Sequence, residues 1–377
     1  MNHRVLVLVR PEHCGQVGWR GNHVRDTESW SPSSRSVFRG HSMHCAGAVV
    51  RPVLLRGSPF AQSDHIVIAK TTSPGVDHLR HGRFLSVNAM TTIVTTPDGR
   101  ELCVESGGDP SGRPVLGLLG SPAGRQMMDR WLEDAERDGV HLISYDRPGY
   151  GASTAHPGRC VADCAGDVRV IANALGIDRA AVWGVSGGGP HALACAALLG
   201  DLVCAVVTFS SLAPYGESGL DWFEGMGMEN ANDARLALDN PNAAHQASVK
   251  LREELLALTS EQIDARARSL PSAEASALPY YRWWLMTNLK EALALGPEGK
   301  WDDGCAFLAP WGFELSAIGV PVQLWHGKVD ETIPCQHSQW LADQIPAAEL
   351  HLTDAEGHLS VFVNHLDQAQ GWLLQHF

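Results

Sequence analysis

Ser186 stands in the sequence Gly184-Val185-Ser186-Gly187-Gly188, with a glycine two positions before it and another two positions after it. The apolar run Ala180–Val185 leads into it, and a helical pattern, Gly188–Leu199, follows. A serine on a tight strand-to-helix turn needs small neighbours, and the turn projects its hydroxyl above the sheet edge. At the helix N-terminus, the backbone N–H of Gly187 can point at a developing oxyanion. We therefore predict Ser186 as a nucleophile and Gly187 as an oxyanion donor.

A serine hydroxyl is a weak nucleophile until a base takes its proton. His358 is the predicted base, because it follows Gly357 after the last apolar run and precedes the terminal helical pattern. His191 lies one turn into the helix after Ser186, His351 lies within a strand pattern and His365 lies on the terminal helix. Their positions make these three histidines poorer candidates.

An acid on the other imidazole nitrogen fixes the tautomer and stabilises the imidazolium. Asp330 is the predicted acid, because it lies just beyond the apolar run Val320–Trp325; its neighbour Glu331 is the rival. A second oxyanion donor is expected after the apolar run Val115–Leu119, in the loop Gly120–Gly124. Pro122 has no N–H, so Ser121 is the predicted donor, although the same residues also fit an ordinary Gly/Pro turn.

These residues are placed by alternating apolar strands and amphipathic helices. The expected strands are Thr92–Thr96, Leu102–Glu105, Val115–Leu119, Val140–Tyr145, Ala180–Val185, Val203–Phe209, Val320–Trp325 and Ala348–Leu352. The expected helices between them are Gln126–Arg137, Val161–Leu175, Gly188–Leu199, Gln336–Ile345 and Leu359–Leu374. This pattern predicts an α/β fold with a mostly parallel, eight-stranded sheet covered by helices on both faces.

The alternation breaks twice along the chain. Residues 214–311 have few strand signals, and their helical stretches predict a helical cap inserted into a core made of residues 91–213 and 312–377; an independent helical domain is the alternative. Residues 1–90 are rich in Arg, His, Ser, Gly and Pro without a sustained period, which predicts a disordered N-terminal extension. A start of translation at Met90 would also account for this change of character.

The charge, the apolar runs and the cysteine spacing indicate which kinds of partner to expect. The net charge is −13, and after residue 90 the chain has 18 Lys and Arg against 37 Asp and Glu, so nucleic acid is not an expected partner. No run of 18 apolar residues occurs, and Val5–Val9 is too short for a signal-peptide core. Nine irregularly spaced cysteines favour reduced thiols in a cytoplasmic protein over a metal site. No membrane association and no metal are predicted.

Four blocks resemble the α/β-hydrolase superfamily, in its branch of capped serine esterases, epoxide-hydrolase-like proteins and proline iminopeptidase-like proteins. They are Gly120–Gly124, Tyr145–Ser153, Gly184–Gly188, and Trp325–Asp330 with Gly357-His358. The resemblance covers about three quarters of the chain and implies an α/β-hydrolase fold with a cap. The second block braces the floor of the active site in this superfamily, and we assign it a structural role. The superfamily usually has His-Gly where this chain has Leu119-Gly120, and that His helps to hold the oxyanion loop.

The resemblance and the residues together predict a serine hydrolase that cleaves a small, largely apolar carboxylic ester or lactone without a cofactor. Epoxide hydrolases and haloalkane dehalogenases of the superfamily use Asp where this chain has Ser186, so their chemistry is not expected. Candidate substrate-binding residues are Trp222, Phe223, Trp283 and Trp284. Two alternatives stay open: an aminopeptidase, with Glu217, Asp221, Glu224 and Glu229 available to hold an amine, and a non-catalytic ligand-binding protein on the same scaffold. The oligomeric state is not predicted.

Overall fold

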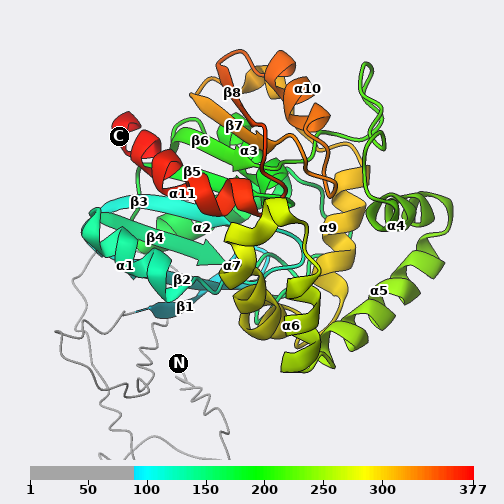
Figure 1. Cartoon of the computed structure of the whole chain (residues 1–377). Coiled ribbons are helices and arrows are strands. Elements are labelled where there is room, and N and C mark those ends of the chain that lie inside the picture. Colours follow the sequence, from blue (N-terminus) through cyan, green and yellow to red (C-terminus); the bar gives the residue numbers. More distant parts are fainter. Residues whose placement is uncertain (1–88) are drawn as a thin grey trace, which may run out of the picture. The chain divides into compact units, whose positions relative to one another are not determined.

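The computed structural model describes residues 89–377 (Figure 1). The predictions of a disordered extension or a later start therefore concern residues that lie, apart from Ala89 and Met90, outside the described part of the chain. In the described part, no helix is both long and apolar enough to cross a bilayer.

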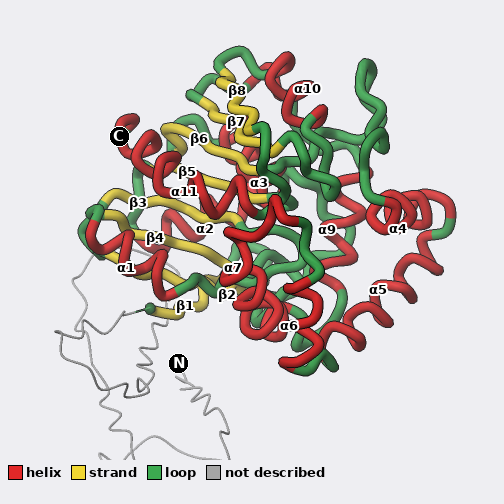
Figure 2. Tube along the Cα trace, viewed as in Figure 1, coloured by secondary structure: helices red, strands yellow, loops and turns green. Residues whose placement is uncertain are grey.

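Eight strands form one twisted sheet, which crosses the centre of the molecule in Figure 2. The strands are β1 Met90–Thr95, β2 Glu101–Gly108, β3 Arg113–Leu118, β4 Val140–Tyr145, β5 Ala180–Val185, β6 Val203–Phe209, β7 Val322–Gly327 and β8 Ala348–Thr353. Their order is β1-β2-β4-β3-β5-β6-β7-β8, with β1, β2 and β4 paired antiparallel and the neighbours from β4 to β8 paired parallel. The predicted fold class is confirmed.

Helices cover both faces of the sheet, as the apolar strands require. Helices α1 (Asp129–Arg137) and α11 (Ser360–Leu373) share one hydrophobic core with the sheet. A second core includes residues of α2 (Asp163–Leu175), α3 (Gly188–Leu198) and α10 (Gln336–Gln344). Strands β5, β6 and β7 are buried along their whole length, which explains why they are apolar at every position rather than at every second one.

The segment between β6 and β7 is helical, and we call residues 210–321 the helical insertion. It contains α4 Met228–Asp239, α5 Pro241–Leu256, α6 Ser260–Arg268, η1 Ser272–Ala277, α7 Leu278–Trp283, the π-helical turn η2 Trp284–Asn288, α8 Leu289–Ala292, α9 Glu298–Leu308 and η3 Leu315–Ala317. The chain ends in η4 Leu374–His376. The helical stretches of this segment were predicted, although α4 and α9 show no clear apolar stripe in the sequence.

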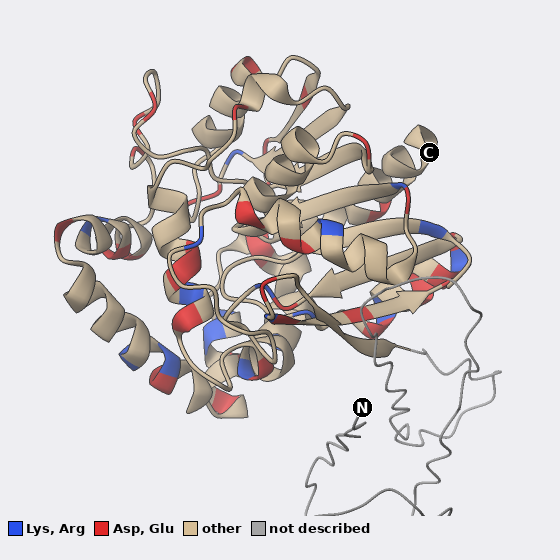
Figure 3. Ribbon diagram, turned by 180° about the vertical axis from the view of Figure 1, so that it is seen from behind, with Lys and Arg blue, Asp and Glu red and all other residues tan. Residues whose placement is uncertain are grey.

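Local sequence signals set several helix starts in the insertion. Asn240 caps α5 by accepting from the N–H of Ala243, and Pro241 occupies the first turn. Thr259 and Gln262 form a capping box at the start of α6. Seen from behind, basic positions lie among acidic ones on the helices (Figure 3), and some pair along one helix, as Lys250 and Glu254 do at 3.6 Å.

Candidate active site

Ser186 lies on the turn between β5 and α3 with a φ of 53°, in the left-handed region that residues with a side chain rarely adopt. Close backbone packing forces this turn. A side chain on Gly188 would put its first carbon 1.9 Å from the carbonyl oxygen of Leu118, and one on Gly184 would meet the carbonyl oxygen of Gly188 at 2.5 Å. The strained turn leaves Ser186 partly exposed while its neighbours are buried.

The three residues predicted as nucleophile, base and acid lie in one hydrogen-bonded chain. The Nε2 atom of His358 lies 3.0 Å from the Oγ atom of Ser186, and its Nδ1 atom lies 2.8 Å from the Oδ2 atom of Asp330. Ser186 follows β5, Asp330 follows β7 and His358 follows β8, so the sheet brings residues 172 positions apart to the same edge. This arrangement can move a proton from a serine hydroxyl to an imidazole that a carboxylate holds in place.

His358 and Asp330 shift each other's pKa in opposite directions. Burial raises the pKa of the Asp330 carboxyl, but the charge of His358 and hydrogen bonds from His326 and His358 outweigh it and hold that pKa well below its usual range. Burial also opposes the charged form of His358, yet the charge and hydrogen bond of Asp330, with a smaller effect of Glu274, raise the pKa of His358 above 6.5. The other oxygen of Asp330 accepts from the backbone N–H groups of Thr332 and Ile333 at 2.8 and 3.0 Å.

The rival residues lie elsewhere or contact other groups. His191 is buried with its Nδ1 atom 3.5 Å from the carbonyl oxygen of Val161. His351 stacks on Trp325, and His365 lies 2.9 Å from a carboxylate oxygen of Glu356. The rival acid Glu331 is exposed.

The loop that follows β3 lies directly over Ser186. A side chain on Gly120 would put its first carbon 3.4 Å from Cβ and 3.8 Å from Oγ of Ser186. A first side-chain carbon on Gly187 would lie 3.1 Å from the amide nitrogen of Ser121. The two residues predicted as oxyanion donors, Ser121 and Gly187, are therefore neighbours beside the Ser186 hydroxyl.

Arg147 holds this loop through hydrogen bonds to its main chain. Its guanidinium donates to the carbonyl oxygens of Leu119 and Gly120 at 2.6 and 2.8 Å. The same group pairs with the buried Asp303 of α9 at 2.7 Å, and Asp303 also accepts from the Tyr150 hydroxyl at 2.9 Å. The Tyr150 hydroxyl lies 2.8 Å from the Oγ atom of Ser121. The block Tyr145–Ser153 thus fixes the loop through two side chains, Arg147 and Tyr150.

Two residues of the helical insertion also form hydrogen bonds with this loop and the residues that follow it. Asn288 is fully buried; its side chain accepts from the N–H of Gly124 and donates to the carbonyl oxygens of Gly124 and Gln126. The indole N–H of Trp284 donates to the carbonyl oxygen of Pro122 at 2.9 Å. Both residues belong to the π-helical turn η2, a kind of irregularity that is frequent at functional sites.

The four predicted substrate-binding residues contact different parts of the molecule. Trp222 is buried and donates its indole N–H to the carbonyl oxygen of Ala213, so it belongs to the hydrophobic core. Phe223 packs beneath the guanidinium of Arg235, 4.4 Å from its ring centre. Trp283 packs on Trp131, with ring centres 5.5 Å apart. Of the four, Trp284 contacts the loop over Ser186.

Phe307, which the sequence analysis did not single out, approaches the turn itself: its Cζ atom would lie 3.0 Å from a first side-chain carbon built on Gly187. Nothing in the local sequence marks it, because it is one apolar residue among others on α9. Its place beside Gly187 depends on how α9 packs on the core.

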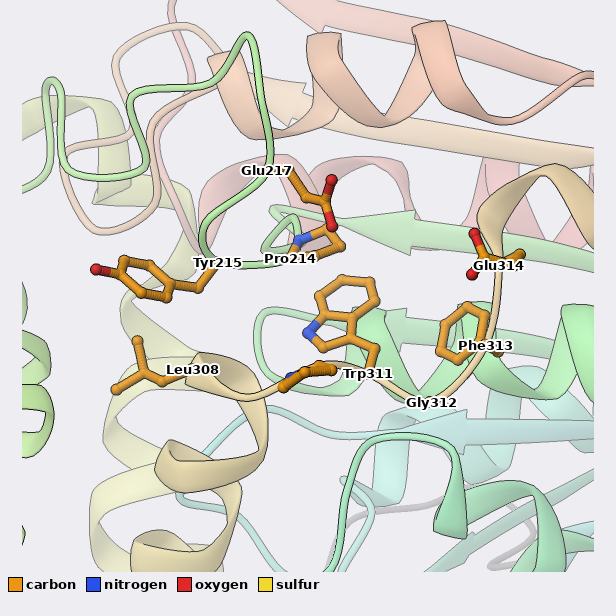
Figure 4. A pocket seen from close by; sticks show the side chains of 9 residues that line it. Pro214, Tyr215, Glu217, Leu308, Trp311, Gly312, Phe313 and Glu314 are labelled. Atoms are coloured by element: carbon orange, nitrogen blue, oxygen red, sulfur yellow. The ribbon is translucent and has the colours of Figure 1, made fainter.

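A separate cavity of about 440 Å³ lies between the segment after β6 and the segment after α9 (Figure 4). Tyr215, Trp311 and Phe313 contribute aromatic walls, and Glu217 contributes a carboxylate. Ser186, Asp330 and His358 are not among its lining residues. Glu217, Asp221, Glu224 and Glu229, the acids considered for binding an amine, are all exposed.

Within residues 89–377, no group of three or more His, Cys, Asp or Glu side chains is arranged to hold a metal ion. The seven cysteines of the described part, Cys160 and Cys164 among them, are free thiols. Cys160 precedes the start of α2 at Asp163, and Cys164 lies within that helix.

Comparisons with known proteins agree with this fold. The sequence model of the family described as alpha/beta hydrolase fold matches residues 113–365. A proline iminopeptidase of Xylella fastidiosa is 25% identical over 319 residues, which cover 79% of this chain and 96% of the relative. A thermophilic esterase from Thermogutta terrifontis has a similar fold, with a TM-score of 0.53 at 22% identity over 76% of this chain and 100% of its own. A bromoperoxidase from Bacillus anthracis gives a TM-score of 0.56 at 19% identity over 76% and 99%.

Proposed function

Because the chain belongs to the α/β-hydrolase family, we propose that it is a serine hydrolase that cleaves a small, largely apolar carboxylic ester or lactone. One observation carries the proposal: the unbroken contacts from Ser186 through His358 to Asp330, at 3.0 and 2.8 Å, on a strained strand-to-helix turn. Its chemistry is transfer of an acyl group first to Ser186 and then to water.

In the first step, Oγ of Ser186 attacks the carbonyl carbon while Nε2 of His358 takes the hydroxyl proton. Asp330 stabilises the imidazolium that results. The carbonyl oxygen becomes an oxyanion and accepts hydrogen bonds from the backbone N–H groups of Gly187 and Ser121. One such donor contributes about 10²–10³-fold in kcat.

The tetrahedral intermediate then collapses. The bond to the alcohol oxygen breaks, His358 gives its proton to that oxygen, and the alcohol leaves. Water attacks the acyl-serine with His358 again as base, which releases the carboxylic acid and restores the Ser186 hydroxyl. A lactone follows the same path, with the alcohol and acid remaining in one molecule. Every group needed is a side chain or backbone amide of this chain.

The preference for apolar substrates rests on what surrounds Ser186. Phe307 packs beside Gly187, and Trp284 packs on the loop that carries Ser121. The four acids that could hold an amine are exposed, and Glu217 lines a cavity from which Ser186 is absent. Within the described residues, the hydrogen bonds of Ser186, Asp330 and His358 reach none of these four acids, and this favours an ester over an N-terminal peptide.

An aminopeptidase acting on a small N-terminal residue is the second candidate, because the similarity to the Xylella proline iminopeptidase spans most of both chains. The two candidates share the same acyl transfer and differ in the leaving group. Parallel assays with a proline p-nitroanilide and with p-nitrophenyl esters of short to medium acyl chains separate them.

The test compares the wild type with Ser186→Ala on that panel, with the exposed Ser316→Ala as matched control. We expect the wild type and Ser316→Ala to hydrolyse esters alike and Ser186→Ala to lose about 10³-fold or more in kcat. Equal turnover by Ser186→Ala would refute the nucleophile. Labelling by a fluorophosphonate probe covers substrates outside the panel: a wild type that is neither active nor labelled would support the non-catalytic binding protein instead.

A further inference from the structure

Glu274, in the short helix η1 of the helical insertion, lies buried against the segment that carries His358. Its carboxylate accepts from the backbone N–H of Leu359 through both oxygens at 3.1 Å, and from the N–H of Ser360 at 2.7 Å. These are the two residues that directly follow His358. Glu274 and Leu359 are 85 positions apart in the sequence, so these hydrogen bonds join the insertion to the core.

The contact meets a need of helix α11. The first N–H groups of a helix have no partner within it, and an N-cap side chain with an oxygen normally supplies one. The N-cap residue of α11 is Leu359, which has no such oxygen and makes no side-chain cap hydrogen bond. Glu274 supplies the missing acceptor, and its negative charge also suits the positive end of the helix dipole.

The sequence around His358 is adapted to this carboxylate. A side chain on Gly357 would put its first carbon 2.4 Å from Oε1 of Glu274, so the carboxylate occupies the space a side chain would fill. On the other side, the Ser210 hydroxyl donates to the carbonyl oxygen of His358 at 3.1 Å, and the N–H of Gly357 donates to the Ser360 hydroxyl at 2.9 Å. Hydrogen bonds thus fix the main chain at His358 itself and at the residues on either side of it.

We propose that Glu274 is a positioning residue for the catalytic base: it fixes the imidazole of His358 against Ser186, and its charge stabilises the imidazolium that forms during acyl transfer. The inference rests on the proposed function. It makes the helical insertion part of the catalytic apparatus, because the start of α11 is capped only when η1 is seated on the core.

Among residues 89–377, two carboxylates influence the charge of His358. Asp330 lies at Nδ1, with His326 behind it, and Glu274 lies at the helix start. Glu356, two residues before His358, is engaged by Asn364 and His365. Asp330 and Glu274 both favour protonated His358, which raises the pKa of this histidine against the opposing effect of burial. Since the base must be neutral to accept a proton, removing the charge of Glu274 should move the acid limb of activity to lower pH.

The experiment measures the rate of labelling by a fluorophosphonate probe against pH for wild type, Glu274→Gln, Glu274→Asp and the exposed insertion control Glu261→Gln. For Glu274→Gln we expect the midpoint of the acid limb to move about half a pH unit lower and the plateau rate to drop about tenfold. Glu274→Asp keeps the charge with a shorter reach, so its limb should return toward the wild type while its plateau stays a few-fold low. Glu261→Gln should match the wild type.

A Glu274→Gln limb that coincides with the wild type, in a variant that is folded by thermal unfolding, would overturn the inference. If that variant does not fold, Glu274→Asp decides: a lowered plateau with a preserved melting temperature supports the inference, and a wild-type plateau overturns it. Loss of labelling in Ser186→Ala is measured alongside. A wild type that is not labelled contradicts the proposed function itself, which separates the two failures.

Discussion

Arg147 donates a hydrogen bond of 2.6 Å to the carbonyl oxygen of Leu119, at the position where related hydrolases usually carry a histidine. Leu119 cannot hold the loop over Ser186 through its apolar side chain, which is buried in the core. The loop is instead held through its main chain, by a guanidinium that reaches two successive carbonyl oxygens. Asp303, fully buried on α9, keeps that guanidinium charged and oriented.

Arg147→Lys should therefore impair catalysis although it preserves the charge. A lysine has no planar fork to reach both carbonyl oxygens and Asp303 at once. We expect kcat for an ester substrate to fall about 10²-fold, because the Ser121 amide loses its fixed position. Breaking the buried pair with Asp303 should also lower the free energy of unfolding by about 3 kcal/mol, measured in urea.

The matched control is Arg137→Lys, at an exposed arginine of α1 whose carboxylate partners are the half-buried Asp134 and the exposed Asp138. It should change neither kcat nor stability appreciably, since exposed ion pairs contribute at most about 1 kcal/mol. An Arg147→Lys enzyme with wild-type kcat would mean that the loop keeps its geometry without the guanidinium.

How much the sequence could predict depends on how local each signal is. The turn at Ser186 could be predicted because a strand, small residues and a helix follow one another within twenty positions. Strands β4, β5 and β6 have the predicted bounds, because they are buried at nearly every position and stand out as apolar runs. The helix before them was predicted from Gln126 but begins at Asp129, since Arg125 and Gln126 are used to bind Glu291.

The residues that hold the site from the helical insertion could not be predicted in this way. Glu274 lies in the sequence Ser-Ala-Glu-Ala-Ser, and nothing local distinguishes it from a surface carboxylate. Asp303 lies in the sequence Trp-Asp-Asp-Gly, and nothing local distinguishes it from a surface carboxylate either. Their roles arise from contacts 86 and 156 positions away, with Ser360 and Arg147, and such contacts appear only when the insertion is packed on the core.

Asp330→Asn should change both the rate and its pH dependence. The charge of Asp330 is the main influence that raises the pKa of His358 against burial. Without it, burial prevails, the pKa of His358 falls, and the acid limb of kcat/KM moves to lower pH. The plateau should drop about 10⁴-fold, because the amide no longer stabilises the imidazolium or its tautomer. A pH–rate profile with a p-nitrophenyl ester measures both effects.

Glu331→Gln is the control for this assignment, since Glu331 is the neighbouring and exposed acid. It should retain the wild-type profile. If Glu331→Gln lost activity while Asp330→Asn kept it, the two carboxylates would have to exchange roles.

Glu105→Gln should stabilise the protein at alkaline pH. Glu105 is buried on β2 and accepts from the N–H of Met127 at 3.0 Å. Burial raises the pKa of Glu105 to about 7, despite the Met127 hydrogen bond and the charge of Arg125. The unfolded value is about 4.3. The folded state therefore binds the proton more tightly, and the wild type loses stability as pH rises from about 4 to about 7.

Glutamine keeps the acceptor oxygen and has no charge to bury. We expect the free energy of unfolding of Glu105→Gln to exceed that of the wild type by about 1–3 kcal/mol at pH 8, with the difference vanishing near pH 4. Urea unfolding at the two pH values measures it. Glu101→Gln, at an exposed position of the same strand, should show no such pH-dependent gain. A wild type and a Glu105→Gln variant whose stabilities run parallel from pH 4 to 8 would rule out a buried, titrating Glu105.

Gly188→Ala tests the close approach that shapes the turn at Ser186. The added carbon would lie 1.9 Å from the carbonyl oxygen of Leu118, which is backbone and has no rotamer to change. Strand β3 and helix α3 must then move apart, so we expect a loss of about 3 kcal/mol in stability and of most fluorophosphonate labelling. Gly166→Ala is the matched control: it lies exposed on α2 with nothing within 4 Å of the added carbon, and it should gain about 0.5–1 kcal/mol. A Gly188→Ala variant with the melting temperature and labelling rate of the wild type would mean that the turn has room for the added carbon. The strained backbone of Ser186 would then need another cause.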